Sequence, residues 1–193
     1  MRATAQLLRR RGYAATGLAD IVKESGAPKG SLYHDFPGGK DQITLAVLRY
    51  ASQKVLQTLN ELAEKATGPT AVLRGYGALL GEWMAASGFQ DSCPITTTLL
   101  ETTPQNRQLT AAGREAFVDW AGIFERGLLQ NGVEEKRAGQ LAKFAIVAIE
   151  GALAPARVEG SDAPIGLAMA EVAKLLEREI ERKTPLPSGA SQG

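Results

Sequence analysis

The chain has 193 residues, 44% of them apolar and 22% charged, which is long enough for a sizeable hydrophobic core in one or two domains. Its 22 Lys and Arg residues against 21 Asp and Glu residues leave a net charge of +1, which excludes a uniformly basic coat for nucleic acid. One cysteine and one histidine exclude an internal disulfide and a Cys- or His-cluster metal site, and we expect no cofactor.

The sequence contains no segment typical of a membrane protein or of secretion. The longest apolar run, residues 144–149, is far too short to span a bilayer. No apolar signal segment follows Met1, and a single Cys93 is typical of a reducing compartment. We therefore expect a cytoplasmic protein without a membrane partner.

Apolar residues recur with helical spacing along almost the whole chain, and the alternation typical of strands is almost absent, so the sequence predicts an all-α fold of about nine helices. Thr16 has the residue type of a helix N-cap, and Ala19 stands where a capping box would have Glu. The Pro-, Ser- and Gly-rich segment 184–193 predicts a disordered tail. The helices are expected over about residues 2–11, 17–25, 28–36, 40–66, 69–86, 95–102, 104–130, 134–157 and 161–183.

Positive charge is concentrated in the first quarter of the chain. Residues 1–50 hold eight Lys or Arg and four Asp or Glu, a balance of +4, whereas the other 143 residues hold 14 and 17, a balance of −3. This asymmetry indicates either a small basic unit that faces a polyanion or random scatter. We expect one domain over 1–45, a second over 46–183, and the tail over 184–193.

Three short predicted helices within the first 36 residues, two of them joined by the tight turn 24–27, form a helix-turn-helix pattern. The helix after the turn is unusual for a core element, because only Leu32 and Phe36 are strongly apolar. Its hydrogen-bonding side chains suit phosphates and base edges in a DNA major groove, and Gly30 would let the backbone lie close to the duplex. The alternative is a polar surface helix in a generic bundle. The hydrogen-bonding residues are Lys29, Ser31, Tyr33 and His34.

Part of the first 40 residues resembles the DNA-binding domain of the TetR family. The residues that carry the resemblance are Gly12-Tyr13-Ala14-Ala15-Thr16, Ile21-Val22, residues 26–36 and Gly39-Lys40. The helical remainder resembles the family's ligand-binding and dimerisation domain, and residues 92–95, Trp120 and residues 150–152 resemble its LmrA/YxaF-like branch. For Tyr33, the alternative to a DNA contact is packing against the first helix. The resemblance implies that Gly30 and Ser31 approach base edges and that Thr16, Lys29, Tyr33, His34 and Lys40 contact phosphates.

Large aromatic side chains gather in the predicted second domain, with small residues between them. We expect them to line a mostly apolar cavity for a ligand, although an aromatic stripe is also typical of a closed core. Glu150 either faces the ligand, pairs with Arg157 or lies at a dimer contact, and Cys93 could instead sense oxidants as a thiolate. The candidate ligand-binding residues are Trp83, Phe89, Phe117, Trp120, Phe124 and Phe144, with the polar groups Cys93, Thr97 and Glu150.

The resemblance implies a DNA-binding transcriptional regulator. We expect a repressor that binds a pseudo-palindromic double-stranded DNA operator as a homodimer, joined through its last two helices. A small hydrophobic effector would release it from the operator. The alternative is an architectural DNA-binding protein or a regulator without an effector. An enzyme is the weakest interpretation, because no phosphate loop, metal cluster or nucleophile–base pair is visible.

Overall fold

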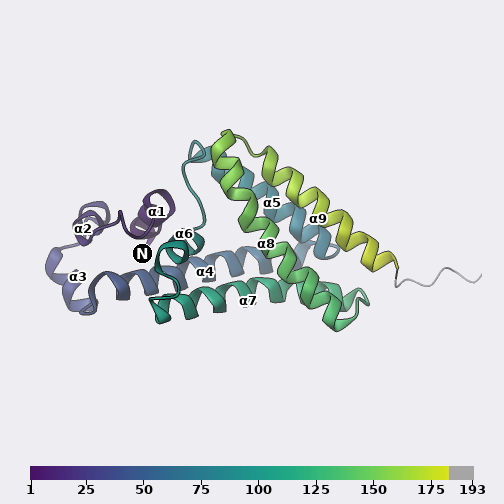
Figure 1. Cartoon of the computed structure of the whole chain (residues 1–193), viewed down its shortest axis with the longest axis horizontal. Coiled ribbons are helices and arrows are strands. Elements are labelled where there is room, and N and C mark those ends of the chain that lie inside the picture. The colour runs from purple at the N-terminus through teal and green to yellow at the C-terminus, as the bar shows by residue number, and fades with distance from the viewer. Residues whose placement is uncertain (183–193) are drawn as a thin grey trace, which may run out of the picture.

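The computed structural model describes residues 1–182, and these fold into nine α-helices without a strand, which confirms the all-α prediction (Figure 1). Helices α1–α3 lie at one end of the molecule, α5, α8 and α9 lie together at the other, and α4 runs between the two ends (Figure 1). The predicted tail, 184–193, lies outside the described residues. The helices are α1 Arg2–Arg11, α2 Leu18–Ser25, α3 Lys29–Asp35, α4 Gly39–Lys65, α5 Pro69–Ala86, α6 Pro94–Thr102, α7 Arg107–Gln130, α8 Glu135–Glu159 and α9 Ala163–Glu181.

The N-terminus of α2 differs from the sequence-based expectation. Gly17, not Thr16, is the N-cap, and its backbone N–H donates to the Asp20 carboxylate at 2.9 Å. The carboxylate of a capping box is therefore present one residue after Ala19. Thr16 is fully buried, and its hydroxyl donates to the backbone carbonyl of Gly12 at 2.7 Å. The prediction that Thr16 caps α2 is wrong because its hydroxyl stabilises the preceding turn instead.

The turn between α2 and α3 is short because Gly26 ends α2 in the left-handed conformation, with φ of 64° and its N–H donating to the carbonyl of Val22. Pro28 is the N-cap of α3, one position before the helical position expected for it. Leu32 is the buried residue of α3, so this short helix is anchored by one side chain.

The start of α7 is also corrected. The helix begins at Arg107 rather than at Pro104, because the side chain of Asn106 caps it and accepts a hydrogen bond from the N–H of Leu109 at 3.1 Å. The other predicted helices agree with the structure to within a few residues.

Two clusters of buried apolar side chains correspond to the two ends of the molecule. The smaller cluster joins α1, α2, α3 and the start of α4, and it includes Ile21, Leu32 and Val47. The larger cluster begins at Leu48 on α4 and extends to Leu176 on α9. The change-over lies close to the predicted boundary at residue 45, and independent folding of the two units stays a prediction. Among the described helices, none is long and apolar enough to cross a membrane.

Candidate functional site

The outer surface of α3 presents the polar residues that the sequence singles out. Lys29, Ser31, Tyr33 and His34 are all exposed, while Leu32 on the opposite face is buried. Tyr33 is 46% exposed, and its ring lies under the Lys29 ammonium at 5.9 Å rather than in the core. The surface is therefore open to a polyanion along its length.

Gly30 on this surface is not required by packing within the chain. A Cβ atom added at this position would meet no atom within 4 Å. The absence of a side chain leaves the α3 backbone accessible from outside, as close approach to a duplex would need.

Lys40, at the start of α4, is held close to the same end of the molecule. Its ammonium lies 3.9 Å from the centre of the Tyr13 ring, a cation–π contact, and the Tyr13 hydroxyl donates to Asp41. Burial, and then the hydrogen bond and the charge of Asp41, raise the pKa of Tyr13 to about 12. The position of Lys40 in the first turn of α4 combines its charge with the positive end of the helix dipole.

Thr16 does not belong to this surface. It is fully buried between α1 and α2, and its hydroxyl is already engaged with Gly12. The expected phosphate contact of Thr16 is therefore wrong, because no duplex reaches a side chain without exposed area.

A large apolar cavity lies between α6, α7 and α8. Its volume is about 890 Å³, within the range of sites for small organic molecules. It opens to solvent, since Leu100 and Val118 on its rim are 81% and 61% exposed. Its lining comprises Thr96, Leu99, Leu100 and Thr103, then Thr110, Arg114, Phe117, Val118, Ala121 and Glu125, and Lys143, Ile146, Val147 and Glu150.

Glu150 places a carboxyl group in the lining of this cavity. One carboxyl oxygen accepts a hydrogen bond from the Thr96 hydroxyl at 2.6 Å. Burial raises the pKa of Glu150, while hydrogen bonds from Thr96 and Cys93 partly offset that rise. The expected alternative of a pair with Arg157 is wrong, because no ion pair within 4.0 Å joins the two side chains among the described residues, and the Arg157 guanidinium donates instead to the backbone carbonyl of Arg10 at 3.4 Å.

Of the nine candidate ligand-binding residues, the cavity is lined by Phe117 and Glu150. Trp120 and Phe124 are 2% and 1% exposed and belong to the larger core cluster, as the alternative of a closed core requires. The Trp120 indole donates to the backbone carbonyl of Ser52 at 3.2 Å, which fixes it against α4. Both residues point away from the cavity because they occupy the inner face of α7.

The other five candidates also lie outside the cavity lining. Trp83 and Phe144 are on the surface, and Phe89 is half-buried after the end of α5. The Thr97 hydroxyl lies within hydrogen-bond distance of the backbone carbonyls of Leu8 and Cys93, at 3.0 and 2.9 Å, and donates to them. Burial raises the pKa of the Cys93 thiol, which keeps it protonated and argues against a thiolate sensor. The described residues contain no group of three or more Cys, His, Asp or Glu side chains suited to a metal ion.

Helix α6 connects the cavity to the N-terminal unit, which the sequence does not reveal. The Glu101 carboxylate accepts hydrogen bonds from the backbone N–H groups of Tyr13 and Ala14, at 3.1 and 2.5 Å. A Cβ atom at Gly12 would stand 1.9 Å from this carboxylate, so a side chain at this position would displace the Glu101 carboxylate from its present place. One face of α6 therefore binds the α1–α2 connection through Glu101, while Thr96 and Leu99 on another face line the cavity.

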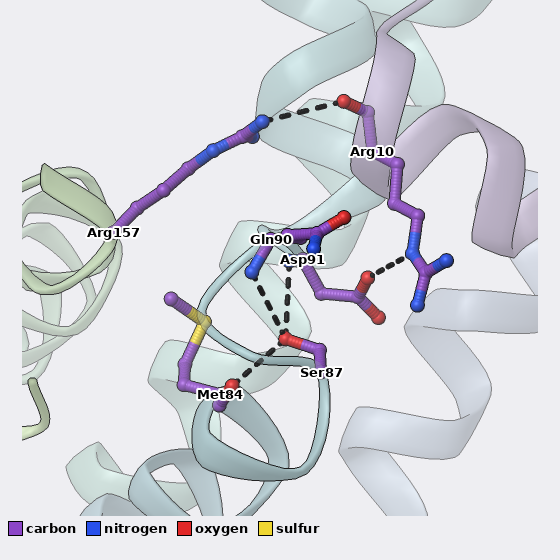
Figure 2. Close-up of polar contacts among 6 residues, drawn as sticks. All are labelled: Arg10, Met84, Ser87, Gln90, Asp91 and Arg157. Atoms are coloured by element: carbon purple, nitrogen blue, oxygen red, sulfur yellow. Dashed lines mark hydrogen bonds and ion pairs between the residues drawn. The ribbon is translucent and has the colours of Figure 1, made fainter. Parts of the chain in front are cut away.

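A second contact joins the two units near the C-terminus of α8 (Figure 2). The Arg10 guanidinium pairs with Asp91 at 2.9 Å, and Arg157 approaches the Arg10 carbonyl from the opposite side (Figure 2). The Ser87 hydroxyl holds the loop that carries Asp91, since it accepts from the N–H groups of Gln90 and Asp91 at 3.2 Å. Arg10 at the end of α1 is thus tied to both the α5–α6 loop and α8.

Comparison with known proteins identifies the two units. Residues 1–47 match the family model of bacterial regulatory proteins of the tetR family, and residues 69–171 match that of the transcriptional regulator LmrA/YxaF-like C-terminal domain. The HTH-type transcriptional regulator LmrA of Bacillus subtilis is 32% identical, over 78% of this chain and 80% of its own. The chain belongs to the TetR family. It is a DNA-binding transcriptional regulator and not an enzyme.

Other similar proteins match over more of the chain. The uncharacterized HTH-type transcriptional regulator MT0206 of Mycobacterium tuberculosis is 30% identical over 93% of both chains. The crystal structure of regulatory protein TetR from Rhodobacter sphaeroides superposes with a TM-score of 0.81 at 24% identity, covering 90% of this chain and 94% of that one. This last likeness shows that the two chains share a fold.

Proposed function

We propose that this TetR-family chain is a repressor that a small hydrophobic effector releases from its operator. The observation that carries the proposal is the double role of α6. Thr96, Leu99 and Leu100 line the cavity, and Thr97 and Glu101 of the same helix bind the N-terminal unit. A ligand that displaces α6 therefore displaces the α1–α2 connection as well.

The physical requirement is that the effector binds two arrangements of the protein with different affinity. In one arrangement α3 has the position that a duplex accepts, and in the other α6 has moved outward around the ligand. The hydrogen bonds that the Glu101 carboxylate accepts are short and charge-assisted. When α6 shifts, the α1–α2 connection would therefore move with it. The Arg10–Asp91 pair, which joins α1 to the α5–α6 loop, adds a second connection.

The DNA-binding half of the proposal uses the α3 surface. Lys29, Tyr33 and His34 would contact phosphates, as would Lys40, while Gly30 and Ser31 would approach base edges. One helix of seven residues makes too few contacts for operator-level affinity, so two copies would bind successive major grooves about 34–36 Å apart.

The last two helices offer the surface for such a homodimer. Among the residues the structure describes, Phe144, Val147 and Val158 on α8 and Leu167 on α9 are large apolar side chains exposed to solvent. A patch of this kind on a single chain is typical of a surface that another chain covers. Light scattering at micromolar concentration is expected to give twice the chain mass, and a monomer mass would exclude this interface.

The decisive experiment is selection of bound sequences from random duplexes, repeated in the presence of a panel of apolar small molecules. We expect an enriched pseudo-palindrome whose complex at least one compound dissociates. Enrichment without a palindrome would contradict the paired α3 helices. A palindrome that no compound of a broad apolar panel releases would favour the alternative, a regulator without an effector.

A further inference from the structure

The outward face of α8 carries a continuous line of residues that nothing in the described chain covers. Phe144, Val147, Gly151, Ala154 and Val158 are all exposed, with Val147 at 65% and Val158 at 87%. Their spacing alternates between three and four residues, which is typical of helices that pack along each other. We call these five residues the α8 seam.

The α8 seam is self-complementary about its centre. Pairing α8 with a second α8 in the antiparallel direction, with Gly151 opposite Gly151, places Phe144 opposite Val158 and Val147 opposite Pro155, which is also exposed. Each larger side chain then faces a smaller one, as an isologous two-fold contact needs. A Cβ atom at Gly151 would meet nothing within 4 Å, so packing within the chain does not explain the glycine, whereas close approach of a second helix does.

The α8 seam also forms one rim of the cavity. Val147 belongs to both, and the cavity continues along the same helix through Lys143, Ile146 and Glu150. A second α8 that covers the N-terminal half of the seam therefore lies over this rim. The residues that it brings there are Pro155 of the partner subunit and Val158 of the partner subunit.

We infer that the cavity is a shared site, closed on its α8 side by the second copy of the chain. The inference rests on the homodimer and the apolar effector of the proposed function and names the residues that complete the site. Val158 of the partner subunit would cover apolar ligand surface next to Val147, where one chain alone leaves the cavity open. Because ligand then contacts both chains, ligand binding strengthens dimerisation, and dimerisation strengthens ligand binding by the same factor.

The test uses Nile red, a neutral apolar fluorophore, as the probe on the full-length dimer. Val158→Gln changes a side chain that is 87% exposed in the single chain, so the fold is expected to persist. At concentrations where light scattering still gives a dimer, we expect the probe affinity to fall about three- to tenfold, since a covering valine is lost. Leu129→Ala, an exposed apolar residue outside the α8 seam and the cavity, is the matched control and is expected to bind as wild type.

A mixed dimer separates a shared site from a site within one chain. One subunit carries Val158→Gln, and the other carries Ala121→Phe, which fills its own cavity; Val118→Trp on the exposed rim replaces Ala121→Phe if that variant does not fold. We expect one tight probe site per mixed dimer, because the intact cavity of the first subunit receives Val158 from the second. Both homodimers are expected to bind weakly or not at all.

Three results would overturn the inference. The first is a Val158→Gln homodimer that binds the probe as wild type does, the second is a mixed dimer no better than that homodimer, and the third is a wild-type dimer that binds no probe. The first two leave the proposed function intact, because operator binding and release are measured separately by the duplex selection. If the mixed dimer has its tight probe site but no compound releases the operator, the result would count against the proposed function alone.

Discussion

The α3 surface and the cavity differ in how their residues are brought together. The α3 surface comes from six consecutive residues, 29–34, on one helix that Leu32 anchors. The cavity is lined by residues between positions 96 and 150 that come from three helices. Neighbouring positions on one of these helices can differ in whether they line the cavity or face the core. A local site can be identified from its residue types in order, whereas a site between helices depends on the rotation of each helix about its own axis.

The largest expected effect tests the division between the core and the cavity on α7. Phe124→Ala should lower the free energy of unfolding by about 3–5 kcal/mol, because a fully buried ring leaves a cavity in the core. Phe117→Ala, on the cavity wall, should cost under about 2 kcal/mol and should change ligand affinity. Urea denaturation and probe titration of both variants check this pair. Equal losses of stability would mean that the ring of Phe117 is a core residue like that of Phe124.

The next effect concerns the connection between the two regions. Glu101→Gln keeps the shape but removes the charge that accepts from Tyr13 and Ala14, which should cost about 1–2 kcal/mol of coupling at this exposed contact. We expect nearly normal affinity for ligand and for operator, but a ligand-induced release that is about fivefold to thirtyfold weaker. Fluorescence anisotropy of a labelled operator measures it. Glu115→Gln, exposed on α7, is the control, and an unchanged release in Glu101→Gln would remove α6 as the connection.

A smaller effect tests the two roles within the α3 surface. Lys29→Ala should weaken binding about tenfold to every duplex and reduce the salt dependence by about one phosphate contact. Ser31→Ala should instead change which sequences are preferred, because base edges carry the sequence information. Affinities for the selected operator and for a scrambled duplex at several salt concentrations give both quantities. The opposite pattern would mean that α3 enters the groove in another orientation.

The smallest effect is a pH dependence at the junction of α4 and the α1–α2 connection. The pKa of Tyr13 is raised from 10.0 to about 12, chiefly by burial and by the hydrogen bond to Asp41. The folded state therefore holds this proton more tightly than the unfolded chain does, so the contribution to stability is complete below pH 10 and is lost between pH 10 and 12. Denaturation of wild type and Tyr13→Phe at each pH separates the contribution of Tyr13 from that of lysines, which titrate in the same pH range. A difference between the two proteins that stays constant over this window would contradict the raised pKa.

The sequence predicted the exposed polar surface of α3 better than the lining of the cavity, and particular residues explain why. Gly26 marks the α2–α3 turn because few other residues adopt its left-handed conformation, and Lys29 and Tyr33 follow at fixed distances. The residue type of Thr16 predicts the N-cap of α2 one position too early, since Gly17 is the cap and its N–H donates to Asp20. The sequence does not distinguish a core position from a cavity position for Trp120, because an aromatic residue on an amphipathic helix has the same pattern in both cases.

The sequence by itself determined the all-helical fold, the helix-turn-helix unit and the membership of the TetR family, because these depend on periodicity and on residues a few positions apart. The tertiary structure alone decided that Glu150 meets Thr96 across 54 residues and that Glu101 meets Tyr13 across 88. Such pairs depend on how whole helices pack, which the core clusters fix through many small contacts at once. The direction in which a side chain points is therefore a property of the packed molecule. Packing places Phe117 on the cavity wall and Phe124 in the core, although both lie on α7.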